Sequence, residues 1–600
     1  MNNFSSSLKQ FFNWDRGTLI LLGAFFCTFM AFNVMWCSWT TFTPFSHFPL
    51  YISTILMTLL LTLPYVIKRC KWLEILLLIL LDFLLLANLM YARTYFNVIP
   101  LSSYTNAGNL QDFMPSVWTS LRWADLIFPL ITCAAILLLT RNNSAIVRQP
   151  KTPLIPYLIT LAIPLLCVLI CVPTPAKYKE EYRKYYNNAY AYQSTPVMYS
   201  VFGSLLYDAL VKYETLTPAE QKETDDFIAS LPGIEKLPEG VTPPENLVVI
   251  FCESLESWVI GLDYDGQQVT PNINKWLTDS TTYYNPHVLS QAKDGRSIDG
   301  QLLLLTGLMP LRQGTYSTQF PDDYFPSIQK ALKQAHGSRA TLMTGDKEYV
   351  WNQGRIARSM GTDSIISFPD FRIEDAFTGR KHIGDRALMR QSVEKLKRGD
   401  IWPENTPAYL QLVTYSGHGP FRLPDSEKKL RIQPGTPQIM ADYMQVAHYT
   451  DQALALMIDY LRSRPDWHKT MVVITGDHEG LAAWRAECLA SEPGRRYVNP
   501  EQFVPLIILN SPLPGHSEKV MGQADIYPTL LHLLGLRDYE WPGVGHSILS
   551  PTHPGAAINP QGKIVTTPGK KLPTTTEQTL QKQRETSDRI LRYNLLRPKQ

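Results

Sequence analysis

Residues 471–480 read MVVITGDHEG, so an apolar run ends directly in an aspartate, a histidine and a glutamate. A short run rich in β-branched residues is typical of a strand that is buried on both faces. Four other runs have this character, and the stretches between them show helical spacing. This alternation predicts an α/β domain with a mostly parallel central sheet. The other runs are NLVVIF (246–251), RATLM (339–343), YLQLVT (409–414) and VPLIIL (504–509), and the helical stretches are 297–307, 326–336, 382–397 and 437–463.

Side chains that can bind a metal follow three of these strands. Glu253 follows the first run, His418 lies shortly after the third, and Asp477 and His478 come directly after the fourth. Ligands bind beyond the carboxyl ends of parallel strands, so we expect these side chains at one edge of the sheet. A lone carboxylate at a strand end is commonly a helix cap or a solvated loop residue, but three such ends are harder to explain in that way. Carboxylate and imidazole ligands together suit manganese, magnesium or zinc.

Ser297 follows Gly295-Arg296 and opens an apolar helical run. Serine is a good helix N-cap, which is one interpretation of this position. The other interpretation is a nucleophile, because the positive field at a helix N-terminus stabilises an alkoxide and an incoming phosphate. A metal ion beside the hydroxyl would lower its pKa further. The spacing alone does not choose between the two.

Five apolar stretches occupy the first part of the chain, and each approaches the roughly 20 residues that cross a bilayer as a helix. With five crossings, the basic residues that flank them all fall on one side, which is the cytoplasm. Everything after Val172 is then expected outside. Asp82 lies inside the third stretch, where we favour a hydrogen bond to a neighbouring helix over a functional role. The stretches are 17–40, 46–67, 73–92, 124–140 and 153–173, and the basic residues are Lys9, Arg16, Lys68, Arg69, Lys71, Arg141, Arg148 and Lys151.

Composition divides the chain and excludes some partners. A formal net charge of +3 over 600 residues, with no basic tract, gives no reason to expect nucleic acid as a partner. Only Cys252 and Cys488 of the eight cysteines lie outside the apolar part, so no disulfide framework is expected. The predicted divisions are a transmembrane domain (1–173), an extracytoplasmic linker with a juxtamembrane helix (174–245), a globular domain (246–550) and a polar tail, mobile or forming one solvated helix (551–600).

Taken together, these features resemble the lipoteichoic acid synthase and phosphoglycerol transferase family, within the alkaline phosphatase and sulfatase superfamily. The resemblance extends over nearly the whole chain: five spans, a linker and a hydrolase-like domain. Each matching motif is modest by itself, and their order and spacing make the set specific. The motifs are Glu253-Ser254 followed by Val269-Thr270-Pro271, Gly295-Arg296-Ser297-Ile298-Asp299, Trp351-Asn352, His418, Gly476-Asp477-His478, and ADIYPTL (524–530) with Leu534-Gly535.

The resemblance implies roles for individual residues. One divalent metal, Mn²⁺ or Mg²⁺ with Zn²⁺ as the alternative, would be bound by Glu253, Ser297, Asp477 and His478. Ser297 would be the nucleophile, where many relatives have threonine. His418 would contact the phosphate or protonate the leaving alcohol, and the substrate pocket would also include Asp346, Trp351 and Arg296.

Three positions depart from the family pattern. Where the glycerol-phosphate enzymes have a histidine and an arginine beside the pocket, this chain has Thr344 and Gln353. A serine shortly after the Asp-His pair is replaced by Ala482. The metal ligands and the nucleophile are retained, so the departures concern the headgroup that the pocket accepts.

The first functional hypothesis is therefore a membrane-anchored transferase. It would move a phospho-headgroup, phosphoglycerol first, from a phospholipid through Ser297 to an envelope lipid or glycan acceptor. Phosphoethanolamine is the alternative headgroup, although relatives that transfer it usually carry several cysteines in the globular domain. The enzyme would lie in a bacterial cytoplasmic membrane, with its catalytic domain outside and periplasmic where an outer membrane exists.

Two other classes of function remain open. A phosphodiesterase or sulfatase would use water as the acceptor. A formylglycine sulfatase is disfavoured because the sequence from Ser297 to Gln301, SIDGQ, lacks the proline and arginine of the C/S-x-P-x-R motif. A non-catalytic lipid- or glycan-binding protein is disfavoured because all four ligand positions carry competent residues.

Overall fold

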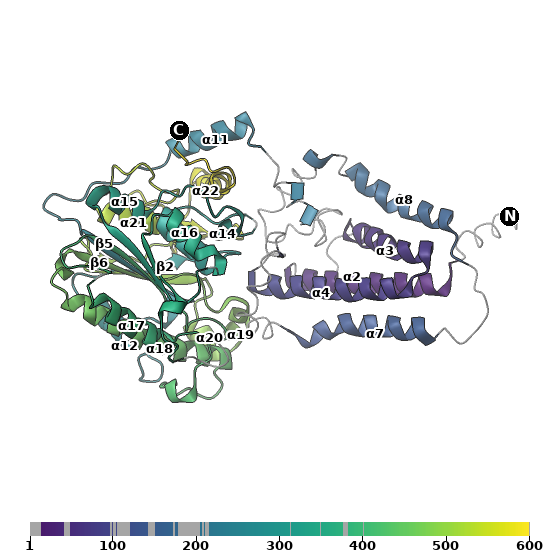
Figure 1. Ribbon diagram of the computed structural model, residues 1–600, viewed down its shortest axis with the longest axis horizontal. Coiled ribbons are helices and arrows are strands. Elements are labelled where there is room, and N and C mark those ends of the chain that lie inside the picture. The colour runs from purple at the N-terminus through teal and green to yellow at the C-terminus, as the bar shows by residue number, and fades with distance from the viewer. Residues whose placement is uncertain are drawn as a thin grey trace. The chain divides into compact units, whose positions relative to one another are not determined.

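The protein forms two compact units in a computed structural model (Figure 1). The first unit comprises Met1–Thr105 and Val117–Thr215, and the second comprises Asn106–Ser116 and Leu216–Gln600. Much of the predicted linker lies outside the described residues. The structure describes residues 14–40, 49–95, 99, 104, 121–141, 151–171, 174–177, 205–206, 209–210, 215–312, 314–348, 350–375, 382–399 and 401–598.

The first unit contains the predicted apolar stretches as helices. Four of them are long and apolar enough to cross a membrane, and Leu154–Ile170 forms a shorter apolar helix. These segments are rich in leucine, isoleucine and phenylalanine, and a helix satisfies their backbone hydrogen bonds internally, as lipid requires. The helices are α2 (Arg16–Thr40), α3 (Pro49–Lys68), α4 (Lys71–Tyr95), α7 (Ile127–Thr140, after a 3₁₀ turn at Trp123–Leu126) and α8 (Leu154–Cys171).

Polar contacts join two of these helices. The Thr132 hydroxyl on α7 donates a 2.6 Å hydrogen bond to the Asp82 carboxylate on α4, which confirms the structural role expected for Asp82. Arg93 on α4 donates two hydrogen bonds, of 2.7 and 2.6 Å, to the Asp125 carboxylate just before α7. Because such groups are costly in an apolar surrounding unless they are paired, these contacts help to define how α4 packs on α7.

The second unit is built on a mixed nine-stranded sheet with the order β4-β3-β5-β1-β6-β7-β2-β8, with β9 paired to β2. The five strands from β4 to β6 are parallel. All five predicted strands are present. The strands are β1 (Asn246–Cys252), β2 (Tyr283–Leu289), β3 (Arg339–Thr344), β4 (Ser364–Ile366), β5 (Ala408–Val413), β6 (Thr470–Gly476), β7 (Phe503–Leu509), β8 (Gly515–His516) and β9 (Met521–Gly522).

One predicted strand, β7, runs antiparallel to both of its neighbours. A parallel connection from β6 would require a crossover, usually a long helix. Residues 477–502 instead form a loop and two six-residue helices, α19 (Arg485–Ala490) and α20 (Glu492–Tyr497). An apolar run carries no information about strand direction, so the sequence pattern could not distinguish the two cases.

Helices cover both faces of this sheet, as Figure 1 shows for α15 and α21 on one side and α17 and α18 on the other. The alternation of side chains in β1 explains the two layers. Leu247, Val249 and Phe251 belong to one buried apolar cluster, and the residues between them belong to the other. The helices of the first layer are α13 (Ser297–Thr306), α15 (Ile328–His336) and α21 (Ile526–Leu533), and those of the second are α12 (Pro271–Leu277), α17 (Asp385–Leu396) and α18 (Gln438–Ser463).

The C-terminal region is not the mobile tail or solvated helix that its composition suggested. Its helix α22 (Thr574–Tyr593) buries Leu580, Ile590 and Leu591 against the first apolar cluster. The Met309 amide also donates a 3.0 Å hydrogen bond to the Ser587 hydroxyl. A small two-stranded sheet of β10 (Ala556–Ile558) and β11 (Ile564–Thr566) precedes the helix. Four of the seven buried α22 residues are polar, which is why average composition hid the contact.

Candidate metal centre and active site

The strands β1 and β6 bring the first ligands together. They pair in parallel, with Cys252 opposite Gly476, so the residues that follow them, Glu253 and Asp477, emerge side by side. The Ser254 amide donates a 2.8 Å hydrogen bond to Asp477 Oδ1 across this junction. On the other side of β1, the Glu253 amide donates to the hydroxyl of Thr414, directly after β5, at 2.9 Å. Three strand ends therefore meet at one edge, as the sequence predicted.

Glu253, Asp477 and His478 form a compact buried cluster. One ligand atom from each lies within 4.8 Å of the others. His478 Nε2 is 3.4 Å from Glu253 Oε1 and 3.7 Å from Asp477 Oδ2. Asp477 Oδ2 is buried and accepts no hydrogen bond from the described residues. A buried carboxylate oxygen without a partner is costly, and a divalent cation would satisfy it. The donor set therefore fits the metal that the sequence predicted.

Ser297 is the first residue of α13, and its hydroxyl points into this cluster. The hydroxyl donates a 2.9 Å hydrogen bond to Glu253 Oε2 and lies 3.3 Å from His478 Nε2. The helix N-cap is Arg296, and no side-chain cap is present. The N-cap interpretation of Ser297 is therefore wrong, because its hydroxyl contacts the carboxylate.

The charges of the cluster are strongly coupled. Burial and the neighbouring Glu253 carboxylate raise the pKa of Asp477 to about 7. Burial and Arg296 favour neutral His478, but the two carboxylates outweigh them and raise the pKa of His478 to about 9. Burial would also raise the pKa of Glu253, but the nearby His478 and His418 hold it below its usual range. Without a cation, protons bound to Asp477 and His478 compensate the negative charge that a metal ion would otherwise neutralise.

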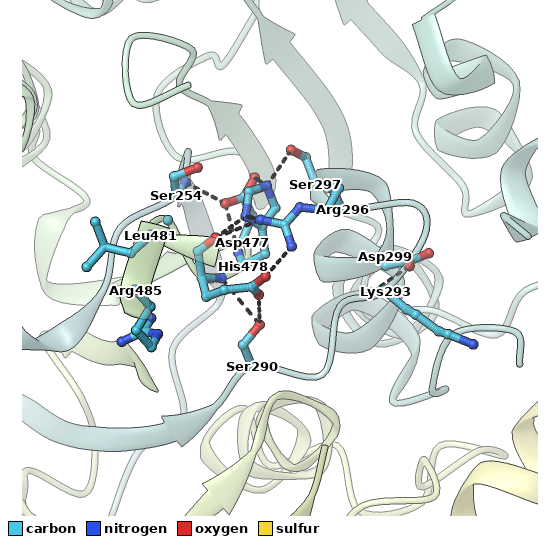
Figure 2. A network of polar contacts seen from close by, with 12 residues as sticks. Ser254, Ser290, Lys293, Arg296, Ser297, Asp299, Asp477, His478, Leu481 and Arg485 are labelled. Carbon is cyan, nitrogen blue, oxygen red and sulfur yellow. Dashed lines mark hydrogen bonds and ion pairs between the residues drawn. The ribbon is translucent and has the colours of Figure 1, made fainter. Parts of the chain in front are cut away.

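Arg296, which the resemblance implied as a residue of the substrate pocket, contacts the loop that follows β6. Its guanidinium forms an ion pair with the Glu479 carboxylate and donates a 2.8 Å hydrogen bond to the Glu479 carbonyl (Figure 2). The Ser290 hydroxyl donates to the other carboxylate oxygen of Glu479 at 2.9 Å. Neither Glu479 nor Ser290 was assigned a role from the sequence. The only local signal was that Glu479 adjoins His478 and Arg296 adjoins Ser297.

The backbone at Arg296 has a strained conformation. Its φ of 48° and ψ of −116° lie in a region that non-glycine residues rarely adopt. Such a conformation costs about 1–3 kcal/mol and persists only where surrounding contacts hold it. The contacts of the Arg296 side chain with Glu479 can hold the backbone in this conformation.

The remaining predicted residues lie in loops that follow β5 and β3. His418 stands after β5, and its ring stacks on Tyr415 with ring centroids 5.8 Å apart. Asp346 follows β3, and its carboxylate accepts a 2.8 Å hydrogen bond from the Lys347 amide. Trp351 is half-buried and adopts a left-handed backbone conformation with φ of 53°.

The positions that depart from the family pattern are buried. Thr344 ends β3, and its hydroxyl accepts a 3.2 Å hydrogen bond from the Asp346 amide. The Gln353 amide group is 3.4 Å from the Gln301 side chain on α13. Ala482 follows the metal-binding loop with φ of 37°. Two of the three therefore contact segments that carry predicted site residues, although neither brings a charge to the pocket.

Comparisons with known proteins agree with this architecture. Residues 1–219 match the family model of the lipoteichoic acid synthase N-terminal domain, and residues 245–536 match the sulfatase family model. Lipoteichoic acid synthase 2 of Bacillus subtilis (strain 168) is 25% identical over 554 residues, covering 86% of this chain and 83% of that protein. The lipoteichoic acid synthase of Staphylococcus aureus (strain USA300) is 23% identical over 567 residues, covering 88% of this chain and 86% of that protein.

A solved structure also resembles the second unit. The lipoteichoic acid synthase LtaP of Listeria monocytogenes aligns with a TM-score of 0.48 and 20% identity, covering 62% of this chain and 97% of that one. The two family models together account for both units of the chain. The chain is thus a membrane enzyme that belongs to the lipoteichoic acid synthase and phosphoglycerol transferase family of the alkaline phosphatase and sulfatase superfamily.

Proposed function

We propose that this enzyme is a metal-dependent phosphotransferase that uses Ser297 as its nucleophile. It moves the phospho-headgroup of a membrane phospholipid, phosphoglycerol in the first instance, to an acceptor alcohol on an envelope lipid or glycan. The observation that carries the proposal is the Ser297 hydroxyl, which lies at a helix N-terminus, 2.9 Å from Glu253 and 3.3 Å from His478. A hydroxyl held among cation ligands is arranged for activation as a nucleophile.

The metal centre in this proposal consists of Glu253, Ser297, Asp477 and His478. Members of the superfamily use a divalent metal, and we expect Mn²⁺ or Mg²⁺ here, with Zn²⁺ as the alternative. When bound, the cation lowers the pKa of the serine hydroxyl and neutralises charge on the phosphate. The unpartnered Asp477 Oδ2 and the raised pKa of Asp477 support a cation at this place.

The chain's own residues divide the remaining work. Ser297 loses its hydroxyl proton to solvent, its Oγ attacks the phosphorus of the phosphodiester as the alkoxide, and the bond from phosphorus to the diacylglycerol oxygen breaks. His418 gives a proton to that leaving oxygen, so diacylglycerol departs as a neutral alcohol. The positive field at the N-terminus of α13 favours the negative charge of the phosphate. An acceptor hydroxyl then attacks the phosphoserine, returns its proton to His418 and restores Ser297.

The membrane part supports a lipid donor over a soluble one. Four helices long enough to cross a bilayer hold the enzyme at the surface where phospholipid is found. With the shorter helix α8 as a fifth crossing, the basic residues between the helices support an orientation with the catalytic unit outside the cytoplasmic membrane of a bacterium. In this proposal, residues 1–173 are the anchor, 174–245 the linker and 246–550 the catalytic domain.

The same site could transfer another headgroup or use another acceptor, and the experiment below distinguishes these alternatives. Membership of the lipoteichoic acid synthase and phosphoglycerol transferase family favours phosphoglycerol. The lack of a cationic side chain at Thr344 and Gln353 is the reason to test phosphoethanolamine as well. Water as the acceptor would make the same site a phosphodiesterase.

The experiment is intact-mass measurement of the full-length protein after incubation with Mn²⁺ and mixed bacterial phospholipids. We expect a mass increase that matches glycerol phosphate and is absent in Ser297→Ala. An increase that matches phosphoethanolamine would change the headgroup but retain the mechanism. Diacylglycerol release is measured in the same samples, because fast hydrolysis leaves no adduct. Neither adduct nor diacylglycerol would contradict the transferase proposal.

A further inference from the structure

Two residues that are 183 positions apart in the sequence meet in one buried ion pair. Arg296 directly precedes the proposed nucleophile, and Glu479 directly follows the ligand His478. The side chains are only 13% and 5% exposed to solvent, so the pair is almost fully withdrawn from water. A buried guanidinium retains its charge, and removal of either partner would leave the other charge uncompensated.

The guanidinium makes more than one contact at this place. Besides the Glu479 carboxylate, one of its nitrogens reaches the Glu479 carbonyl at 2.8 Å and lies 2.9 Å from His478 Nδ1. Figure 2 shows Arg296 extending from the start of α13 toward His478. The planar fork of arginine suits such a multiple contact, whereas a lysine ammonium is a single point of charge. The pair therefore constrains the orientation of the imidazole as well as the distance between the two segments.

A third segment completes the arrangement. Ser290, directly after β2, donates through its hydroxyl to Glu479 Oε2 at 2.9 Å and accepts from the Glu479 amide at 3.3 Å. Glu479 is thus held from both sides.

We propose that Arg296 and Glu479 are positioning residues that lock the Ser297 end of α13 to the metal-binding loop, so that the Ser297 hydroxyl and the His478 imidazole meet at one cation. Arg296 then acts through Glu479 and His478, and it is not a ligand of the substrate phosphate. This inference rests on the proposed function, because it assigns the pair to that same site. Partners that orient metal ligands affect metal affinity and turnover without contacting the substrate.

A matched control exists elsewhere in the same domain. Arg464 and Asp466 form a comparably buried pair, with side chains 6% and 4% exposed and a 2.7 Å contact. They precede β6, whereas Asp477 and His478 follow it, so the control lies at the opposite edge of the sheet. Loss of this pair would affect stability alone.

The experiment compares Arg296→Gln, Arg296→Lys and Arg464→Gln in the full-length protein. Mn²⁺ affinity and the Mn²⁺ electron paramagnetic resonance spectrum report on the metal site without turnover. For Arg296→Gln we expect about 10-fold weaker Mn²⁺ binding, an altered spectrum and about 100-fold slower formation of the Ser297 adduct, with the KM for phospholipid nearly unchanged. Arg464→Gln should lower the Tm and leave the other quantities at wild-type values.

Arg296→Lys keeps the positive charge, so we expect the protein to fold. The lysine ammonium cannot make the several contacts that the planar guanidinium makes. We expect intermediate Mn²⁺ affinity and an intermediate adduct rate, which decide the matter if Arg296→Gln does not fold. Wild-type values for Arg296→Lys in both measurements would overturn the proposal, as would a raised phospholipid KM with unchanged Mn²⁺ affinity in Arg296→Gln. Equal loss of Mn²⁺ affinity in Arg464→Gln would also overturn it. If the wild type forms no adduct, the proposed function fails, and the Mn²⁺ measurements still test the positioning pair.

Discussion

Gly300 of α13 lies directly against the backbone of Asp477. A Cβ at position 300 would stand 2.2 Å from the Asp477 carbonyl oxygen, which is closer than any side-chain carbon can approach. The same carbonyl accepts a 2.7 Å hydrogen bond from Gln523, so it cannot retreat without breaking that contact. Glycine at this position allows the helix that carries Ser297 to reach the loop that carries Asp477 and His478.

We therefore expect Gly300→Ala to separate the nucleophile from the metal ligands. Overpacking of this kind costs about 1–3 kcal/mol of stability, and here the displacement falls between Ser297 and Asp477. Adduct formation and Mn²⁺ affinity should both fall by more than the loss in Tm would explain. Gly233→Ala is the control, because no heavy atom lies within 4 Å of a Cβ built there. Full activity in Gly300→Ala would contradict the close-packing argument.

Replacing Asp477 with asparagine should stabilise the metal-free protein and abolish its response to metal. Two carboxylates, Glu253 and Asp477, are buried beside one another, and burial together with Glu253 raises the pKa of Asp477 to about 7. Removing this buried charge should recover about 1–3 kcal/mol at pH 8. Thermal unfolding with EDTA and then with Mn²⁺ measures both effects. The idea fails if Asp477→Asn lowers the metal-free Tm or retains the Mn²⁺-induced rise.

The strand ends were predictable because their signals are local. An apolar run followed at once by a carboxylate identifies β1 and β6, and parallel packing requires such ends to share an edge. The proximity of Glu253, Asp477 and His478 could therefore be predicted without knowledge of the loops. The local signal at Ser297 was ambiguous, because the start of an apolar helix fits a helix cap as well as a nucleophile.

Contacts between distant segments left no such local signal. Nothing in the sequence around Arg296 indicates that it pairs with Glu479, and a lone glycine such as Gly300 in a helical run does not reveal what it packs against. The strand β2 (YYNPHVL) was missed because Pro286 and His287 interrupt its apolar pattern. Tertiary packing determines each of these features, and periodicity reports only on the segment itself.

The metal-free protein should lose stability as the pH rises from acid to alkaline values. The pKa of Asp477 is raised from 3.8 to about 7 and that of His478 from 6.5 to about 9, so the folded state binds more protons than the unfolded chain. For each group, this stabilisation of the folded state is complete below the pKa in the unfolded chain. It is lost as the pH rises past the pKa in the folded protein. Urea unfolding in EDTA across this range measures the slope, and Asp477→Asn should remove the part that ends near pH 7. A flat profile in the wild type would contradict the pKa shifts.

Mn²⁺ affinity should change in the opposite direction. Asp477 and His478 must lose their protons to become ligands, so protons compete with the cation below about pH 7 and about pH 9, respectively. We expect affinity to increase by about tenfold per pH unit for each proton displaced in this range. Equilibrium binding at fixed ionic strength tests this. If the affinity does not vary between pH 6 and pH 9, Asp477 and His478 are not protonated in the metal-free protein.

Finally, Leu591→Ala in α22 should destabilise the catalytic unit even though it lies in a polar segment far along the chain from every ligand. Leu591 is 1% exposed and belongs to the same apolar cluster as Leu302 and Leu305 of α13. Removing a buried leucine side chain costs about 2–5 kcal/mol. Lys582→Ala, an exposed change on the same helix, should leave the Tm unchanged. Thermal unfolding of the two variants decides between a docked helix and a dispensable tail, since a tail predicts no difference between them.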